Sequence, residues 1–202
     1  KNAGLILLSL VFFTMTSKIA RNLGKSYEKK MYQQLGGMPS TIALRFSDDT
    51  FDEITKKRYH KKLNLFEGIA LPLNVSDETT DTDQQYISAS NILRNYANSN
   101  RDKEQRVYQE LKEYNFWRNL YGTKSIALVA YLLIIIREII LQSPIDIETV
   151  FLHPDPECGG LIFMVLWAVA FMWLVNKKTV TQKAFDYAKS LIEVCERIPT
   201  EA

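Results

Sequence analysis

Three stretches of apolar residues constrain the fold of this chain more than any other feature. They cover residues 3–15, 125–141 and 161–175. A helix needs about 20 predominantly apolar residues to cross a bilayer core, so each stretch is short for a span. The third stretch has no polar residue, and a helix that is apolar on every side must be buried all round or face lipid. A chain of 202 residues has little core for such a helix, so we expect three transmembrane helices.

The alternative is a soluble protein with three core helices, because apolar stretches of about 10–14 residues are also typical of buried helices. The distribution of charge favours the membrane. Lys and Arg follow the first stretch, precede the second and follow the third, whereas residues 143–160 carry four carboxylates and no Lys or Arg. The positive-inside rule then predicts that the basic flanks are cytoplasmic and that residues 143–160 lie outside.

The predicted fold class is therefore an all-α integral membrane protein with about three transmembrane helices and a helical cytoplasmic domain. The chain starts with Lys1 rather than Met, so we expect a longer N-terminus that would also lengthen the first helix. The expected segments are a first transmembrane helix at 1–16, a cytoplasmic helical domain at 17–123, a second transmembrane helix at 124–142, an external loop at 143–160, a third transmembrane helix at 161–176 and a cytoplasmic C-terminal helix at 177–202.

Local signals predict the helices of the cytoplasmic domain. A charged helix over residues 17–35 continues from the first apolar stretch, and Gly36 and Gly37 stop it. Thr50 followed by Glu53 fits a capping box, which predicts a helix over about 51–66. The other expected elements are a polar loop at 70–82, helices at 83–98 and 101–120 that lead into the second span, an amphipathic helix at 180–197 and one weak strand candidate at 41–46.

Arg137 and Glu138 interrupt the second apolar stretch near its outer end. Ionisable groups inside a span usually face a bundle interior or a water-filled cavity, so this pair could line a pore formed by several copies, with Ile134 as part of a hydrophobic gate. Alternatively, the membrane ends before the pair, both side chains extend to the interface, and the Ile-rich stretch faces lipid.

The densest basic block lies at residues 56–62, and three interpretations fit it. It could contact anionic lipid headgroups, bind the phosphates of a nucleotide or oligonucleotide signal with Tyr59 as a stacking face, or form the solvated face of a helix. For either binding interpretation the candidate residues are Lys57, Arg58, Tyr59 and Lys61.

No combination of residues indicates catalysis. The two histidines, His60 and His153, are expected on opposite sides of the membrane, and Cys158 and Cys195 are likewise separated, so neither pair can share a metal or form a disulfide. Motifs of metalloproteases, serine hydrolases and dithiol enzymes are absent. We therefore expect no catalytic residue, no metal site, no cofactor and no enzyme activity. The net charge of +2 also argues against a wholesale nucleic-acid binder.

Four short elements of the cytoplasmic domain form a recognisable pattern: Gly36-Gly37-Met38-Pro39-Ser40-Thr41, Arg45 to Asp48, Arg58-Tyr59-His60 and Arg118-Asn119-Leu120-Tyr121-Gly122. Together they resemble a family of bacterial multi-span membrane proteins that has no assigned activity. The resemblance covers about residues 20–125 and transfers no catalytic residue. In outline the layout is also similar to small membrane effectors of anti-phage systems that respond to nucleotide signals, which is an analogy of architecture alone.

Three functions are compatible with these observations. The first is an oligomeric inner-membrane effector or ion channel that a ligand gates through the cytoplasmic domain, possible partners being membrane lipids, further copies of the chain and a nucleotide-derived signal. The second is a membrane anchor or scaffold that recruits a cytoplasmic protein. The third is a membrane enzyme acting on lipid or peptide, which would need a polar cluster within the bilayer that the sequence does not display.

Overall fold

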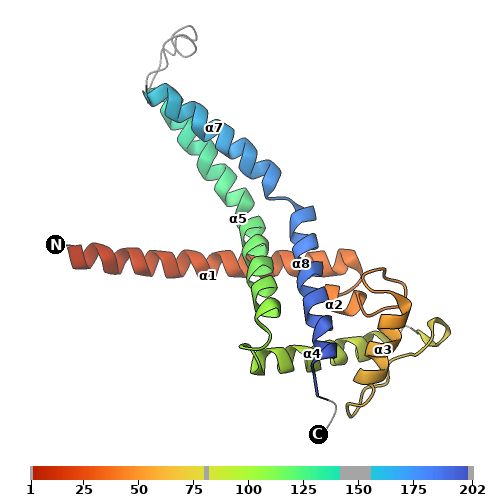
Figure 1. The fold of residues 1–202 in the computed structure, drawn as a ribbon. Helices are drawn as coiled ribbons and strands as arrows, with labels where there is room; N and C mark the ends of the chain where they lie inside the picture. Colours follow the sequence, from red (N-terminus) through yellow and green to blue (C-terminus); the bar gives the residue numbers. More distant parts are fainter. Residues whose placement is uncertain (1, 80–81, 142–155, 200–202) are drawn as a thin grey trace. The chain divides into compact units, whose positions relative to one another are not determined.

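The computed structural model describes residues 2–79, 82–141 and 156–199, and in these residues the only regular elements are helices (Figure 1). This confirms the all-α class. Residues 143–155 of the predicted external loop lie outside the described residues, and residues 156–160 are helical rather than loop. The helices are α1 (Asn2–Leu35), α2 (Pro39–Ile42), α3 (Glu53–Leu63), α4 (Thr82–Ser99), α5 (Gln105–Leu141), α7 (Pro156–Leu174) and α8 (Lys177–Ile192), with 3-10 turns η1 (Val75–Asp77) and η2 (Glu193–Glu196).

The chain divides into two compact units, and the division falls within α1, α5 and α8. We call Lys1–Ser26 with Trp117–Val180 the apolar unit, and Tyr27–Phe116 with Thr181–Ala202 the core unit. Each unit is therefore assembled from segments that lie far apart in the sequence.

Apolar side chains cover the surface of the apolar unit. In α1, for example, Leu8 is 68% exposed and Phe12 70%. By length and composition, one described helix, within Gly4–Ile42, can cross a membrane. A second exists if Ile162–Leu174 and Lys177–Glu196, which are bent by 49°, form one broken span. The count of three spans stays a prediction.

Helices α5 and α7 lie side by side in the apolar unit (Figure 1). The indole of Trp167 on α7 donates a hydrogen bond of 3.0 Å to the hydroxyl of Tyr131 on α5. The ammonium of Lys124 on α5 donates to the carbonyl oxygens of Met172 and Val175, at 2.8 and 2.7 Å. A cation at the C-terminus of a helix satisfies carbonyls that have no partner in the helix and complements the helix dipole.

Helices α1 and α5 cross at two glycines of the apolar unit. A Cβ atom placed on Gly122 would lie 2.5 Å from the backbone nitrogen of Gly24 and 2.7 Å from the carbonyl carbon of Leu23. A Cβ atom on Gly24 would lie 2.9 Å from the Cα of Asn119. Such distances are too short for any side chain, so only glycine lets these two backbones approach so closely.

The core unit is built around α4, against which α2 and η2 both pack, and η2 also packs on α3. Its first segment begins in α1, which ends as predicted at Gly36 in the left-handed conformation (φ 78°). The amide of Gly37 donates to Tyr32 O at 2.9 Å, as in a Schellman motif. The buried core comprises Ala43, Leu44, Tyr59, Leu63, Ile69, Leu71, Tyr86, Ala89, Leu93, Ala97, Val107, Leu191, Ile192, Val194, Cys195 and Ile198.

Two local predictions are wrong. Residues 41–46 form the end of α2 and the following turns rather than a strand, because Pro39 starts a helical turn in which Ile42 N–H donates to Met38 O. The capping residue of α3 is Asp52 and not Thr50, since the Asp52 carboxylate accepts from Thr55 N–H at 2.9 Å. The helix consequently begins at Glu53, two residues later than predicted.

The other helix predictions hold within a few residues. Helix α4 covers the predicted 83–98, and α8 with η2 covers most of 180–197. The helix expected at 101–120 and the second apolar stretch form one continuous helix, α5. Helix α7 begins at Pro156, five residues before the third apolar stretch.

Candidate functional site

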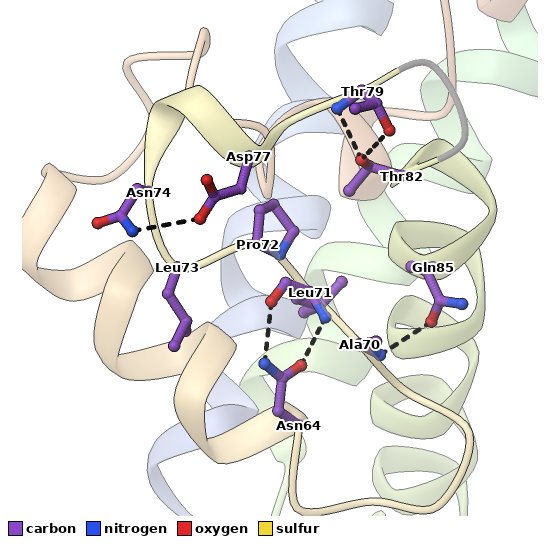
Figure 2. A pocket seen from close by; sticks show the side chains of 10 residues that line it. All are labelled: Asn64, Ala70, Leu71, Pro72, Leu73, Asn74, Asp77, Thr79, Thr82 and Gln85. Atoms are coloured by element: carbon purple, nitrogen blue, oxygen red, sulfur yellow. Dashed lines mark hydrogen bonds between the residues drawn. The ribbon is translucent and has the colours of Figure 1, made fainter.

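A polar groove of about 600 Å³ opens in the core unit beside the segment that joins α3 to α4 (Figure 2). The side-chain amide of Asn64, just after α3, holds one wall by donating to Leu71 O at 2.9 Å and accepting from Leu71 N–H at 2.6 Å. The groove is lined by Asn64, Ala70, Leu71, Pro72, Leu73, Asn74, Asp77, Thr79, Thr82 and Gln85.

The polar side chains of the groove mostly shape its own walls. Gln85 accepts from Ala70 N–H at 3.0 Å, and Asn74 donates to the Asp77 carboxylate at 3.2 Å (Figure 2). Thr82 accepts from Thr79 N–H at 2.9 Å. The groove therefore combines amides, hydroxyls and one carboxylate with the apolar side chains of Leu71, Pro72 and Leu73, and none of its lining residues is a cation that would suit an anion. The sequence signal for it is only the polar character of the loop at 70–82.

The imidazole of His60 is fully buried next to this wall. Its Nδ1 lies 2.7 Å from the carbonyl oxygen of Pro72, which lines the groove, and its Nε2 lies 2.9 Å from Leu44 O. Burial lowers the pKa of His60, and the two carbonyls and the carboxylate of Glu78 act in the opposite direction. His60 thus ties the groove wall to the turn after α2.

A hydrogen bond joins two of the four motif elements, the glycine turn and the segment that begins at Arg45. Arg45 donates to Gly36 O at 2.8 Å and forms a two-pronged ion pair with Asp83, at 2.9 and 2.7 Å. Glu78 accepts from the Tyr86 hydroxyl at 2.8 Å. The glycine turn and the following arginine therefore have a structural role, which is to fasten the end of α1 to the start of α4.

The basic block at 56–62 lies on α3, and two of its cations pair with carboxylates of the core unit. Lys57 pairs with Glu53 at 2.7 Å, and Arg58 pairs with Glu196. Tyr59 is buried, which raises its pKa to about 12 and leaves its ring little accessible for stacking. Lys61 is exposed, and no described residue forms an ion pair with it.

Lys56, in the same block, is 2% exposed and donates to the carbonyl oxygen of Asp48. Burial lowers the pKa of this ammonium. The block is therefore amphipathic, with Lys56, Tyr59 and His60 on the buried face of α3. Ligand binding by Lys57, Arg58, Tyr59 and Lys61 stays a prediction, and Arg58 and Lys61 are the exposed members of that set.

The three residues predicted to line a pore lie together on α5 in the apolar unit. Arg137 and Glu138 are bonded to each other, and the Arg137 side chain is 67% exposed. Ile134 is 43% exposed. Residues three and four positions apart share one helix face, so Ile134 lies beneath both members of the charged pair.

Among the described residues, no group of three or more His, Cys, Asp or Glu side chains is arranged to hold a metal ion. Cys195 is a buried free thiol, and burial raises its pKa to about 12, which makes it a poor nucleophile. His153 and the side chain of Cys158 lie outside the described part of the chain. The predicted separation of the two histidines and of the two cysteines therefore stays a prediction.

Comparison with known proteins does not place this chain in a family. No protein-family model, no curated protein and no solved structure matches it. The geometry of the two units is therefore what supports a function.

Proposed function

We propose that this protein is an oligomeric inner-membrane effector or ion channel that is gated through its core unit. In this proposal α1, α5 and α7 lie in the bilayer and the core unit lies in the cytoplasm. The exposed apolar surface of these helices is the single observation that carries the proposal, because Ile140 of α5 is 68% exposed and Trp173 of α7 is 77% exposed.

An apolar surface of this extent is costly in water. Removing one large apolar side chain from water is worth about 1.5–3 kcal/mol, and monomeric soluble proteins rarely expose contiguous patches of such residues. In α1 the exposed residues follow one another without interruption from Leu5 to Leu8 and from Leu10 to Phe13. A lipid environment accommodates a helix that is apolar on all sides, whereas a single protein partner would cover only one face.

The charged pair on α5 supports assembly into a pore. Arg137 and Glu138 lie within an otherwise apolar stretch, and lipid contact would be unfavourable for both. If several copies assemble with this face of α5 toward a common axis, the pair lines a water-filled path and Ile134 forms an apolar ring one turn away. A ligand that binds one state of the core unit better than the other would then shift the closed–open equilibrium.

The test is the oligomeric state and the conductance of the protein purified in mild detergent. We expect native mass spectrometry to find a closed homo-oligomer of three or more copies. We expect neutralising the pair, by Arg137→Gln with Glu138→Gln, to change ion selectivity in planar bilayers. Ile136→Val is the control, because Ile136 lies on the opposite face of α5. A monomer, or tight vesicles under all conditions, would contradict the pore.

A membrane anchor that recruits a cytoplasmic protein is the second candidate, and the groove favours it. Exposed apolar side chains, Leu73 and Val75, stand beside the polar lining of the groove, and this mixture is typical of a protein-binding surface. The anchor predicts a stoichiometric protein partner that is lost on Leu73→Asp, together with vesicles that stay impermeable. These outcomes separate it from the channel.

A further inference from the structure

The described cations of the core unit differ in whether their charge is compensated. In the basic block, Lys57 and Arg58 each pair with a carboxylate. Near the junction of α4 and α5 the situation is different, because Arg101 and Lys112 pair with no carboxylate in the described residues. Uncompensated cations of the core unit therefore also lie outside the densest basic block of the sequence.

Both of these cations lie close to the ring of one residue, Tyr108. The guanidinium carbon of Arg101 lies 5.5 Å from the ring centre of Tyr108, and the ammonium nitrogen of Lys112 lies 4.8 Å from the same centre. A carboxylate would position these groups by neutralising them. An aromatic face positions a cation and leaves its charge free to attract an anion.

A crevice of about 10 Å³, room for about one water molecule, lies beside this ring, so an anion would bind at its rim rather than inside it. Arg94 of α4 lines it together with Arg101 and Tyr108. Arg94 bonds to the side-chain oxygen of Asn91 at 2.9 Å, which orients the guanidinium without neutralising it. Glu104 also lines the crevice, but its carboxylate is 2% exposed and already binds Arg197 through contacts of 2.6–3.1 Å. One guanidinium and one ammonium thus lie over an exposed ring, and a second guanidinium lines the crevice beside it.

We infer that Arg94, Arg101 and Lys112, gathered around Tyr108, form a binding site for a phosphate-bearing anion. Guanidinium groups suit this ligand because their N–H groups match two phosphate oxygens at once, and the ammonium adds a point charge. The phosphate can come from a soluble nucleotide or from the headgroup of an anionic lipid, since both present the same chemistry. What binding does to the membrane helices rests on the function proposed above, whereas binding itself does not.

The experiment uses the full chain in lipid nanodiscs and two probes. A fluorescent ATP analogue added to neutral phosphatidylcholine discs reports the soluble source through anisotropy. Thermal stability in discs with and without phosphatidylglycerol reports the lipid source. The variant is Arg101→Gln with Lys112→Gln. The matched control is Lys29→Gln with Lys30→Gln, which removes two exposed positive charges from the part of α1 that belongs to the core unit.

If the phosphate comes from a nucleotide, we expect the Arg101/Lys112 variant to bind the ATP analogue about tenfold more weakly and with a shallower salt dependence. If it comes from lipid, we expect the variant to lose the stabilisation by phosphatidylglycerol. The α1 control should stay near wild type. Tyr108→Leu should weaken binding and Tyr108→Phe should not, since phenylalanine keeps the ring; comparing the two separates a loss of binding from misfolding. The inference is overturned if neither probe responds to the wild type, or if the α1 control loses as much.

The two proposals fail separately. The binding assay does not measure conductance. A monomeric or impermeable protein that still binds through Arg101 would therefore contradict the channel but not the binding site. A conducting oligomer that binds neither probe would overturn only the site.

Discussion

The protonation of His60 affects the core unit, because the imidazole lies between two backbone carbonyls in a fully buried position. A neutral imidazole has one N–H and can satisfy only one of these oxygens. The charged groups that face the ring are Glu78, which favours its protonation, and Lys56, which opposes it. The rings of Phe46 and Tyr86 complete its surroundings at 5.1 and 5.6 Å between ring centres.

The lowered pKa of His60 predicts how stability depends on pH. In the unfolded chain the imidazole titrates near its ordinary value of about 6.5, so below that pH the unfolded state binds more protons than the folded state. We therefore expect the melting temperature of the core unit to fall as the pH drops from about 7 toward the lowered pKa. His60→Gln should flatten this dependence over the same range. A wild-type melting temperature that rises on acidification would contradict the assignment.

For the residues of the basic block, the sequence predicts the charges but not the groups that each side chain contacts. Spacing alone could place Lys56, Tyr59 and His60 on one face of a helix, yet a buried lysine and a buried histidine need acceptors. These are Asp48 O and Leu44 O, which come from another segment. Such partners depend on tertiary packing, so the pattern was compatible with a solvated face as well as with a binding face.

The crossing of α1 and α5 depends on a glycine in each helix, so a larger residue at either position should destabilise it. In Gly122→Ala the new methyl group would overlap the backbone of Gly24, and backbone cannot rotate out of the way as a side chain can. We expect a loss of about 1–3 kcal/mol in stability, measured by thermal unfolding in detergent. Gly4→Ala in α1 is the control, because no atom lies within 4 Å of its Cβ position. Equal stability of the two variants would show that the crossing is not formed.

Element boundaries followed from local chemistry where that chemistry is unambiguous. Two glycines after a helical pattern predict the end of α1 correctly, because Gly36 adopts a conformation that other residues rarely take. The start of α3 was harder, since Thr50 and Asp52 are both good capping residues. The shape of the groove could not be predicted, because it depends on two side chains that bond to the same short segment from different helices. Asn64 bonds to Leu71 from the end of α3, and Gln85 bonds to Ala70 from α4.

On the scale of the whole molecule, the core unit is discontinuous, and its last segment fills its centre. Leu191 is fully buried there, far in the sequence from the helices it packs against. We expect Leu191→Ala to lower stability by about 2–5 kcal/mol, because it removes buried methyl groups and leaves a cavity. Lys189→Ala, at an exposed position of α8, should be near neutral. Chemical denaturation of the full chain measures both, and a neutral Leu191→Ala would contradict the packing.

This discontinuity has a consequence for biosynthesis. During translation all three apolar stretches are made before residues 181–198, which supply Leu191, Ile192 and Val194 to the core. The core unit therefore cannot close while the apolar helices are emerging from the ribosome. Any property that requires a finished core unit therefore arises only after the last apolar helix has been synthesised.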